Sequence, residues 1–244
     1  MNITDRLIRK LLTSSKLANA DVVAIQDLPI YLRDLERDHP IVREGDRTDH
    51  SCLLVEGFAC RSKTTDEGKR QILSIHIPTE IPDLQTVHLR VMDHDLTALS
   101  RCTVGFIPHD AIRALAHARP AVAAALWRET LIDASIFREW IVNGRRSAPK
   151  RMAHLVTELA KRLEAVGLLV GDNFELPMTQ LDLADALGLT PVHVNRVMQE
   201  LRKDGLLEFR RFVVTLGDAE RLRQLGDFDD LYLHQAPQEE VYAH

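Results

Sequence analysis

The sequence predicts an α+β protein in which an antiparallel β-roll is followed by one long helix and then by a small domain of helices and a hairpin. Three observations support this prediction. Short apolar runs separated by turn residues fill residues 40–108. An apolar helical period then runs from Pro120 to about Asn143. Finally, two helices with recognisable caps follow each other between Thr179 and Gly205.

Glycine-containing turns divide the first of these regions into short strands. They lie at Glu44-Gly45-Asp46, Glu56-Gly57 and Asp66-Glu67-Gly68. Apolar runs separated by such turns are typical of consecutive hairpins, which build an antiparallel sheet. We therefore expect residues 1–118 to form an N-terminal helix and a β-roll of the double-stranded β-helix type.

The long helix has a clear beginning and a clear end. Pro120 suits a first helical position because proline has a fixed φ and no backbone N–H to leave unpaired, while Asn143 and Gly144 supply a stop or a hinge. Its apolar positions are Val122, Leu126, Ile132, Ile136 and Trp140. This stripe needs a partner, either the roll of its own chain or the same helix of a second chain, and we expect both. We assign residues 119–144 to a dimerisation helix with its hinge.

Residues 179–205 carry the local signals of a helix-turn-helix. Thr179 can cap the first helix, and Asp182 can reach back to complete an approximate capping box. Thr190 caps the second helix, Pro191 takes its first position, and Gly205 ends it. Small or apolar residues that let two such helices pack closely are Leu183, Ala184, Leu187, Gly188, Leu189, Val194 and Val197. These signals are independent of one another and agree on the same motif.

Side chains on the second helix and on the hairpin behind it indicate contact with DNA. The predicted base-reading residues are Val192, His193, Asn195, Arg196 and Gln199. The predicted contacts to the DNA backbone are Thr179, Thr190, Arg210 and Arg211, of which the two arginines lie at the tip of a possible wing. Arg196 suits a bidentate contact to guanine. A packed helix pair without a DNA role is the alternative, but these side chains favour a winged helix-turn-helix DNA-binding domain over residues 145–225.

The composition is that of an ordinary globular protein, with 45% hydrophobic and 27% charged residues and a net charge of −5. Residues 145–225 nevertheless contain 13 Lys and Arg against 11 Asp and Glu, a mild local advantage for binding DNA. Residues 226–244 form an acidic tail. The longest apolar run, Ala121 to Trp127, is far below the ~18–20 residues that cross a bilayer. We expect a cytoplasmic protein without membrane contact.

Several stretches of the sequence, together with the helix-turn-helix, match motifs that are typical of one known family. They are REGD at Arg43 to Asp46, LLVEGFAC at Leu53 to Cys60 and RRSAPKRMAHLVTELA at Arg145 to Ala160. From about Leu28 to Leu225 the chain resembles the Crp/Fnr family of bacterial transcription regulators. The resemblance implies a homodimer joined by the long helix, a palindromic DNA site, and rotation about the hinge at Asn143 and Gly144. We expect double-stranded DNA, a second copy of the chain and RNA polymerase as partners.

The second helix departs from the family at two positions. Val192 and Asn195 stand where members typically carry an acidic residue and a small residue, whereas Arg196 is kept. The resemblance therefore implies an operator that is related to the usual half-site but distinct from it.

The ligand region departs further. Members that bind cyclic nucleotides carry a Gly-Glu turn and, about ten residues on, an Arg with Ser or Thr that neutralises the phosphate. This chain has Pro82 and Asp83 at the turn and approximately Asp93 and His94 at the pair, and Arg90 could substitute only if the loop were displaced. The possible effector pocket is thus Asp83, Arg90, Asp93 and His94. We expect no cofactor, because an aspartate repels a phosphate and the N-terminal cysteine cluster of the family's iron–sulfur sensors is absent.

An alternative of another class is a β-barrel metal-binding protein or enzyme of the cupin type. His76, His88 and His94 lie in one stretch and could ligate a metal, although isolated histidines are more often solvated or satisfied in the core. That alternative leaves Thr179 to Gly205 unexplained. We therefore expect a DNA-binding regulator without enzymatic activity, whose roll either senses an unidentified signal or serves as a dimerisation platform.

Overall fold

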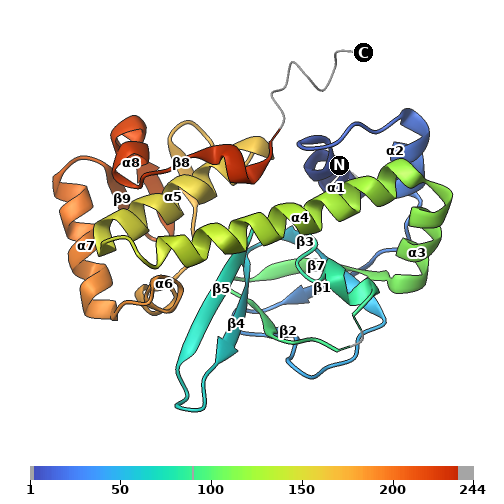
Figure 1. Cartoon of the computed structure of the whole chain (residues 1–244), viewed down its shortest axis with the longest axis horizontal. Coiled ribbons are helices and arrows are strands. Elements are labelled where there is room, and N and C mark those ends of the chain that lie inside the picture. Colours follow the sequence, from blue (N-terminus) through green and yellow to red (C-terminus); the bar gives the residue numbers. More distant parts are fainter. Residues whose placement is uncertain (1–2, 90, 236–244) are drawn as a thin grey trace. The chain divides into compact units, whose positions relative to one another are not determined.

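The computed structural model describes residues 3–89 and 91–235, which form two compact units (Figure 1). The first unit contains residues 3–62, 75–89, 91–134 and 234–235, and the second contains residues 63–74 and 135–233. Among the described residues, no helix combines the length and the apolar character needed to cross a bilayer. Each unit has its own buried core.

The first unit contains the predicted antiparallel roll. One sheet has the strand order β1-β7-β3 and the other has the order β2-β6-β4-β5, with antiparallel pairing between the strands whose registers are defined. Gly57 forms the turn between β3 and β4 with a φ of +84°, where an added Cβ would lie 2.3 Å from the Arg101 carbonyl oxygen. Only glycine fits such a turn. The strands are β1 (Tyr31–Leu35), β2 (Pro40–Val42), β3 (His50–Glu56), β4 (Ala59–Thr64), β5 (Arg70–His76), β6 (Asp95–Ala98) and β7 (Cys102–Pro108). Residues 63–74, which include the end of β4 and most of β5, belong to the second unit.

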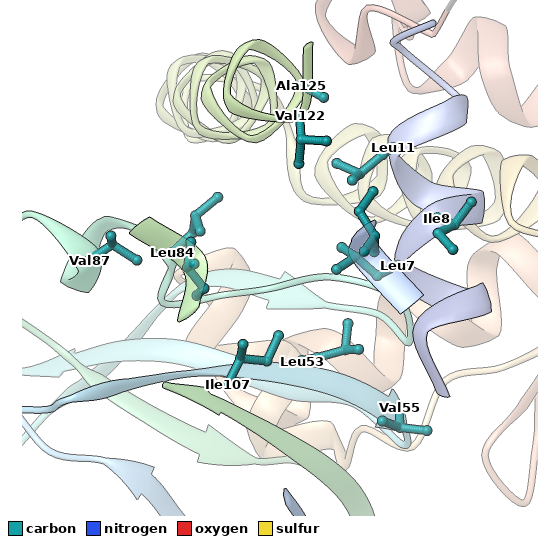
Figure 2. Packing of buried hydrophobic residues seen from close by; sticks show 12 residues of the cluster. Leu7, Ile8, Leu11, Leu53, Val55, Leu84, Val87, Ile107, Val122 and Ala125 are labelled. Carbon is teal, nitrogen blue, oxygen red and sulfur yellow. The ribbon is translucent and has the colours of Figure 1, made fainter. Parts of the chain in front are cut away.

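Helices accompany this roll in the first unit and share its core. Figure 2 shows Val122 of the long helix α4 pointing into a cluster with Leu11, Leu53 and Ile107, all fully buried. A second cluster around Cys52 and Leu96 lies among the strands. The helices are α1 (Ile3–Leu12), α2 (Asn19–Gln26), the 3₁₀ helix η1 (Leu84–Val87), α3 (His109–Ala118) and α4 (Pro120–Asn143), whose last residues belong to the second unit.

The second unit contains the predicted winged helix-turn-helix. Thr179 Oγ1 accepts a hydrogen bond from the backbone of Asp182 at 3.1 Å, and the Asp182 carboxylate accepts one from the Thr179 backbone at 2.9 Å, so the capping box is confirmed. Gly188 ends the first helix at a φ of +64°. The elements are α5 (Ala148–Ala165), β8 (Asn173–Glu175), α6 (Gln180–Leu187), α7 (Pro191–Lys203), β9 (Leu207–Arg210), β10 (Val213–Leu216), α8 (Ala219–Leu225) and the 3₁₀ helix η2 (Asp230–Leu233).

Residues 228–233 of the C-terminal segment dock on α5. The Tyr232 hydroxyl donates to Glu158 Oε2 at 2.8 Å and lies 3.2 Å from Nε2 of His154. Phe228 and Leu233 are buried beside it. The acidic residues Glu239 and Glu240 of the expected tail lie outside the described residues.

Candidate nucleic-acid interface

The two faces of α7 differ in character. Val194, Val197 and Leu201 are buried, and this spacing of three and four residues turns one side of the helix toward the core. The residues on the other side, Val192, Asn195, Arg196 and Gln199, are exposed, and His193 is half-buried between them. The structure therefore brings the predicted base-reading side chains together on one outward face, where they can reach a groove of DNA.

The wing is a tight hairpin between β9 and β10. Arg210 pairs with Val213, so Arg211 and Phe212 alone form the loop, both at positive φ (48° and 67°). Two consecutive positive φ values are typical of the turn that matches the twist of a hairpin, although a non-glycine residue reaches them only at some cost. Arg210 also pairs with Glu208 at 2.9 Å. Both arginines are exposed, and so is Phe212, which the sequence prediction missed because no local signal marks it as a tip residue.

The two capping threonines lie exposed at the beginnings of α6 and α7. Thr190 Oγ1 accepts from the His193 backbone at 3.2 Å. Thr179 Oγ1 accepts from the backbone of Asp182 and also donates to its carboxylate at 2.7 Å. The hydroxyl of Thr179 therefore already uses its proton within the chain, whereas a phosphate contact by Thr179 would require that proton.

The structure corrects the residues predicted for the dimer seam. Val122, Ile132 and Ile136 are at most 5% exposed, so they pack within their own chain and are not available to a second one. Leu126 packs against the same core as Val122. Trp140 is half-buried and donates its indole N–H to Glu158. The helix has a second apolar face, and periodicity alone does not distinguish which face meets the roll.

The exposed face of α4 carries different residues. Trp127 is 68% exposed, Leu131 56% and Ile141 76%. A groove of about 650 Å³ opens beside Trp127, bounded by η1, α3 and α4. This groove is largely apolar, with Leu84, Val87 and Leu126 in its walls. The apolar surface open to a partner thus lies on the face opposite the predicted seam.

The predicted hinge lies at the end of α4 in the second unit. Asn143 is buried, and its amide nitrogen donates to the Arg151 carbonyl oxygen at 3.3 Å. Arg151 in turn donates to the Leu187 carbonyl oxygen at 2.7 Å. Asn143, Gly144, Arg151 and Leu187 line a pocket of about 140 Å³. Asn143 therefore contacts the start of α5, and Arg151 links this part of α5 to the end of α6.

A cluster of polar groups lies inside the roll at the predicted effector pocket. Asp83 is fully buried and accepts a hydrogen bond from the Cys52 backbone at 2.8 Å, and burial raises the pKa of its carboxyl from 3.8 to about 6. His94 lies 2.7 Å from the Asp93 carboxylate, and burial lowers the pKa of its imidazole. Arg90, the fourth predicted residue, lies outside the described residues.

The sequence prediction missed the cation of this cluster. Arg61 is 4% exposed; it donates to the Pro82 carbonyl oxygen at 2.8 Å through Nε and to Asp133 of α4 at 2.5 Å. One signal could have revealed it, since Arg61 stands two residues from Ala59 in a strand and therefore shares the inward face. His76 also belongs to this buried polar cluster, and its Nδ1 lies 3.0 Å from Glu80 Oε2.

The three histidines of the cupin alternative do not form one site. His76 and His94 are buried, whereas His88 is exposed. Within residues 3–89 and 91–235, no group of three or more His, Cys, Asp or Glu side chains is arranged to hold a metal ion. The cupin alternative therefore receives no support from this arrangement.

An antiparallel roll, a long helix and an outward-facing recognition helix with a wing define a DNA-binding transcription regulator. Residues 32–119 match the model of the cyclic nucleotide-binding domain, and residues 150–225 match that of the Crp-like helix-turn-helix domain. The chain belongs to the Crp/Fnr family, whose members are transcription regulators and not enzymes.

Named relatives and a solved structure support this assignment. The chain is 29% identical over 209 residues to the transcriptional activator protein FnrL of Cereibacter sphaeroides, covering 82% of each chain. It is 26% identical over 211 residues to the nitrogen fixation regulation protein FixK of Azorhizobium caulinodans, covering 84% of this chain and 82% of FixK. The structure of FixK2 from Bradyrhizobium japonicum superposes with a TM-score of 0.74 at 25% identity, covering 81% of this chain and 98% of FixK2.

Proposed function

We propose that the protein is a homodimeric transcription regulator that reads a palindromic operator through α7. The observation that carries this proposal is the outward face of α7, on which Asn195, Arg196 and Gln199 are exposed together on a helix anchored by its other side. Amide and guanidinium groups can each make two hydrogen bonds to a purine edge in the major groove. The side chains thus have the chemistry as well as the position for base recognition.

Selection of bound sequences from random DNA tests this proposal. Two-fold symmetry of a dimer predicts two inverted half-sites with centres about one helical turn, ~34 Å, apart. Because Val192 and Asn195 differ from the family pattern, we expect the half-site to differ from the family's usual one. Enrichment of an asymmetric single site, or of no site, would contradict the proposal.

The exposed face of α4 supports the homodimer. Trp127, Leu131, Ala134, Arg138 and Ile141 follow each other in steps of four and three residues, the spacing at which two helices pack along a seam. Trp127 and Leu131 are large, apolar and more than half exposed. A second copy of α4 placed along this face would cover them and the apolar groove beside Trp127.

We expect Trp127→Glu to weaken the dimer about 100-fold, because a tryptophan at the centre of an interface commonly contributes 2 kcal/mol or more, about 30-fold in affinity, and the new charge adds a desolvation cost. Light scattering across a dilution series measures this effect. Tyr31→Glu is a matched control, since Tyr31 is an aromatic residue that is also exposed (66%) but lies on β1, which pairs with β7. A Trp127→Glu protein that remains dimeric at the same concentrations as the parent would disprove the seam.

We also propose that the roll acts without a cyclic nucleotide. The residues at the pocket do not suit a phosphate, because Asp83 and Asp93 stand near it and the guanidinium of Arg61 is held by Pro82 and Asp133. Titration calorimetry with cyclic AMP and cyclic GMP should detect no binding. A saturable heat with either nucleotide would overturn this part of the proposal.

Two further features of the proposal follow from its relatives. FnrL is named a transcriptional activator, which supports RNA polymerase as a partner of this chain. Reading chromosomal DNA in a bacterium takes place in the cytoplasm, which is the location we propose. Co-purification of the polymerase on immobilised operator DNA, in the presence and absence of the protein, tests the first of these.

A further inference from the structure

The tip of the β4–β5 hairpin belongs to the DNA-binding unit. Residues 63–74 pack with residues 135–233, although β4 and β5 also belong to a four-stranded sheet with β2 and β6. Arg70 of β5 makes the polar contact. Its Nε donates to Asp185 Oδ2 at 2.7 Å, and its terminal nitrogen donates to Asp182 Oδ1 at 2.6 Å. Both carboxylates belong to α6, the first helix of the helix-turn-helix.

The carboxylate of Asp182 has two separate tasks. Its Oδ2 accepts from the backbone and the hydroxyl of Thr179, which holds the beginning of α6, and its Oδ1 accepts from Arg70. The side chain of Asp182 is only 3% exposed. A buried carboxylate is costly unless it is paired and hydrogen-bonded, so the capped end of α6 depends on the guanidinium of Arg70.

An arginine suits this position better than a lysine. Asp182 and Asp185 are three residues apart and therefore lie on the same face of α6, where two like charges repel each other. The planar guanidinium has N–H groups in two directions and binds both carboxylates at once, whereas an ammonium is a single point charge. The side chain of Arg70 is 28% exposed, so it is partly shielded from solvent.

The position of α6 matters for DNA because α6 packs on α7. Ala184 and Leu187 of α6 are buried, as are Val194 and Val197 of α7. Closely packed helices move together, so a shift of α6 would displace the outward face of α7. Arg70 thus acts on the base-reading side chains without touching DNA itself.

We propose that Arg70 is a positioning residue for DNA binding, because its guanidinium holds α6 of the helix-turn-helix through Asp182 and Asp185. This inference rests on the proposed function.

A charge-reversal experiment on the full-length protein tests this inference. Arg70→Glu places a third carboxylate beside Asp182 and Asp185 and should weaken binding to the selected operator about tenfold. It should also speed hydrogen–deuterium exchange in residues 179–187. The double variant Arg70→Glu with Asp185→Arg restores opposite charges and should recover both properties. Lys69→Glu is the matched control, because Lys69 is the neighbouring residue and its side chain is 78% exposed.

The two readouts separate the possible failures. If the parent protein selects no DNA, the proposed function fails, but exchange in residues 179–187 still tests the ion pairs. Unchanged exchange and unchanged affinity in Arg70→Glu, or losses that the charge-reversed pair does not recover, would overturn the inference. Should Arg70→Glu not fold by circular dichroism, Arg70→Gln removes the charge without adding a repulsion and is judged by the same criteria.

Discussion

The interior of the roll and the outward face of α7 both contain polar side chains, but those of the roll are buried and those of α7 are exposed. Arg61 and Asp83 in the roll are 4% and 0% exposed, and each is hydrogen-bonded within the chain. Asn195, Arg196 and Gln199 on α7 are exposed. The first group faces inward and makes its contacts within the fold, whereas the second faces outward and can meet a partner.

This difference in burial distinguishes the residues that stabilise this protein from the residues that recognise DNA. A buried polar group depends on its partner for free energy, so its loss lowers the stability of the folded state. An exposed polar group can be removed at little cost to folding, but its loss removes a contact to DNA. Substitutions in the two regions should therefore have opposite profiles of stability and DNA binding.

The largest effect on stability is expected for Asp133→Ala. This substitution leaves the buried guanidinium of Arg61 without the carboxylate that lies 2.5 Å away. We expect the free energy of unfolding to fall by about 3 kcal/mol, as for other broken buried pairs. Urea denaturation measures it. The exposed pair of Asp110 and Arg113 provides the control, and Asp110→Ala should change stability by less than about 0.5 kcal/mol. Equal effects of the two substitutions would refute the distinction.

An effect of similar size but opposite sign, which depends on pH, is expected for Asp83→Asn. The raised pKa of Asp83 means that the folded protein holds a proton that the unfolded chain releases, so its contribution to stability falls as pH rises from 3.8 to about 6. Over that interval the loss is about 3 kcal/mol. Asparagine does not ionise, so the variant should gain about this amount relative to the parent between pH 4 and pH 7.

Urea denaturation of the parent and of Asp83→Asn at several pH values measures this gain, and Asp66→Asn serves as the control at an exposed position. The prediction fails if the difference in unfolding free energy between parent and Asp83→Asn is the same at pH 4 and at pH 7.

The smallest effect on stability is expected for Arg196→Ala on the outward face of α7. The free energy of unfolding should change by less than about 0.5 kcal/mol. Discrimination at one base pair of each half-site should nevertheless fall by about 1–3 kcal/mol, because a bidentate contact is lost. Competition binding with single-base operator variants measures this. Lys203→Ala, at the exposed end of the same helix, should leave base preference unchanged. If Arg196→Ala lowered the free energy of unfolding by more than this amount, Arg196 would instead be a residue that stabilises the fold.

Much of the DNA-binding unit could be predicted from the sequence because its signals are local. Thr179, Gly188, Thr190 and Pro191 mark the ends of α6 and α7 through contacts within a few residues, and the structure has those ends where the caps predict them. The turns of the roll follow from local signals in the same way. The outward face of α7 then follows from the helical repeat once its buried side is known.

Other features were decided by the tertiary structure alone. The sequence shows an apolar helix from Pro120 to Asn143, but not that Val122 turns toward its own roll while Trp127 remains exposed. It shows Arg70 in a strand, but not that its partners Asp182 and Asp185 lie more than a hundred residues further along the chain. Caps and turns are contacts between neighbours in sequence, whereas burial and ion pairs of this kind exist only once distant segments have packed together.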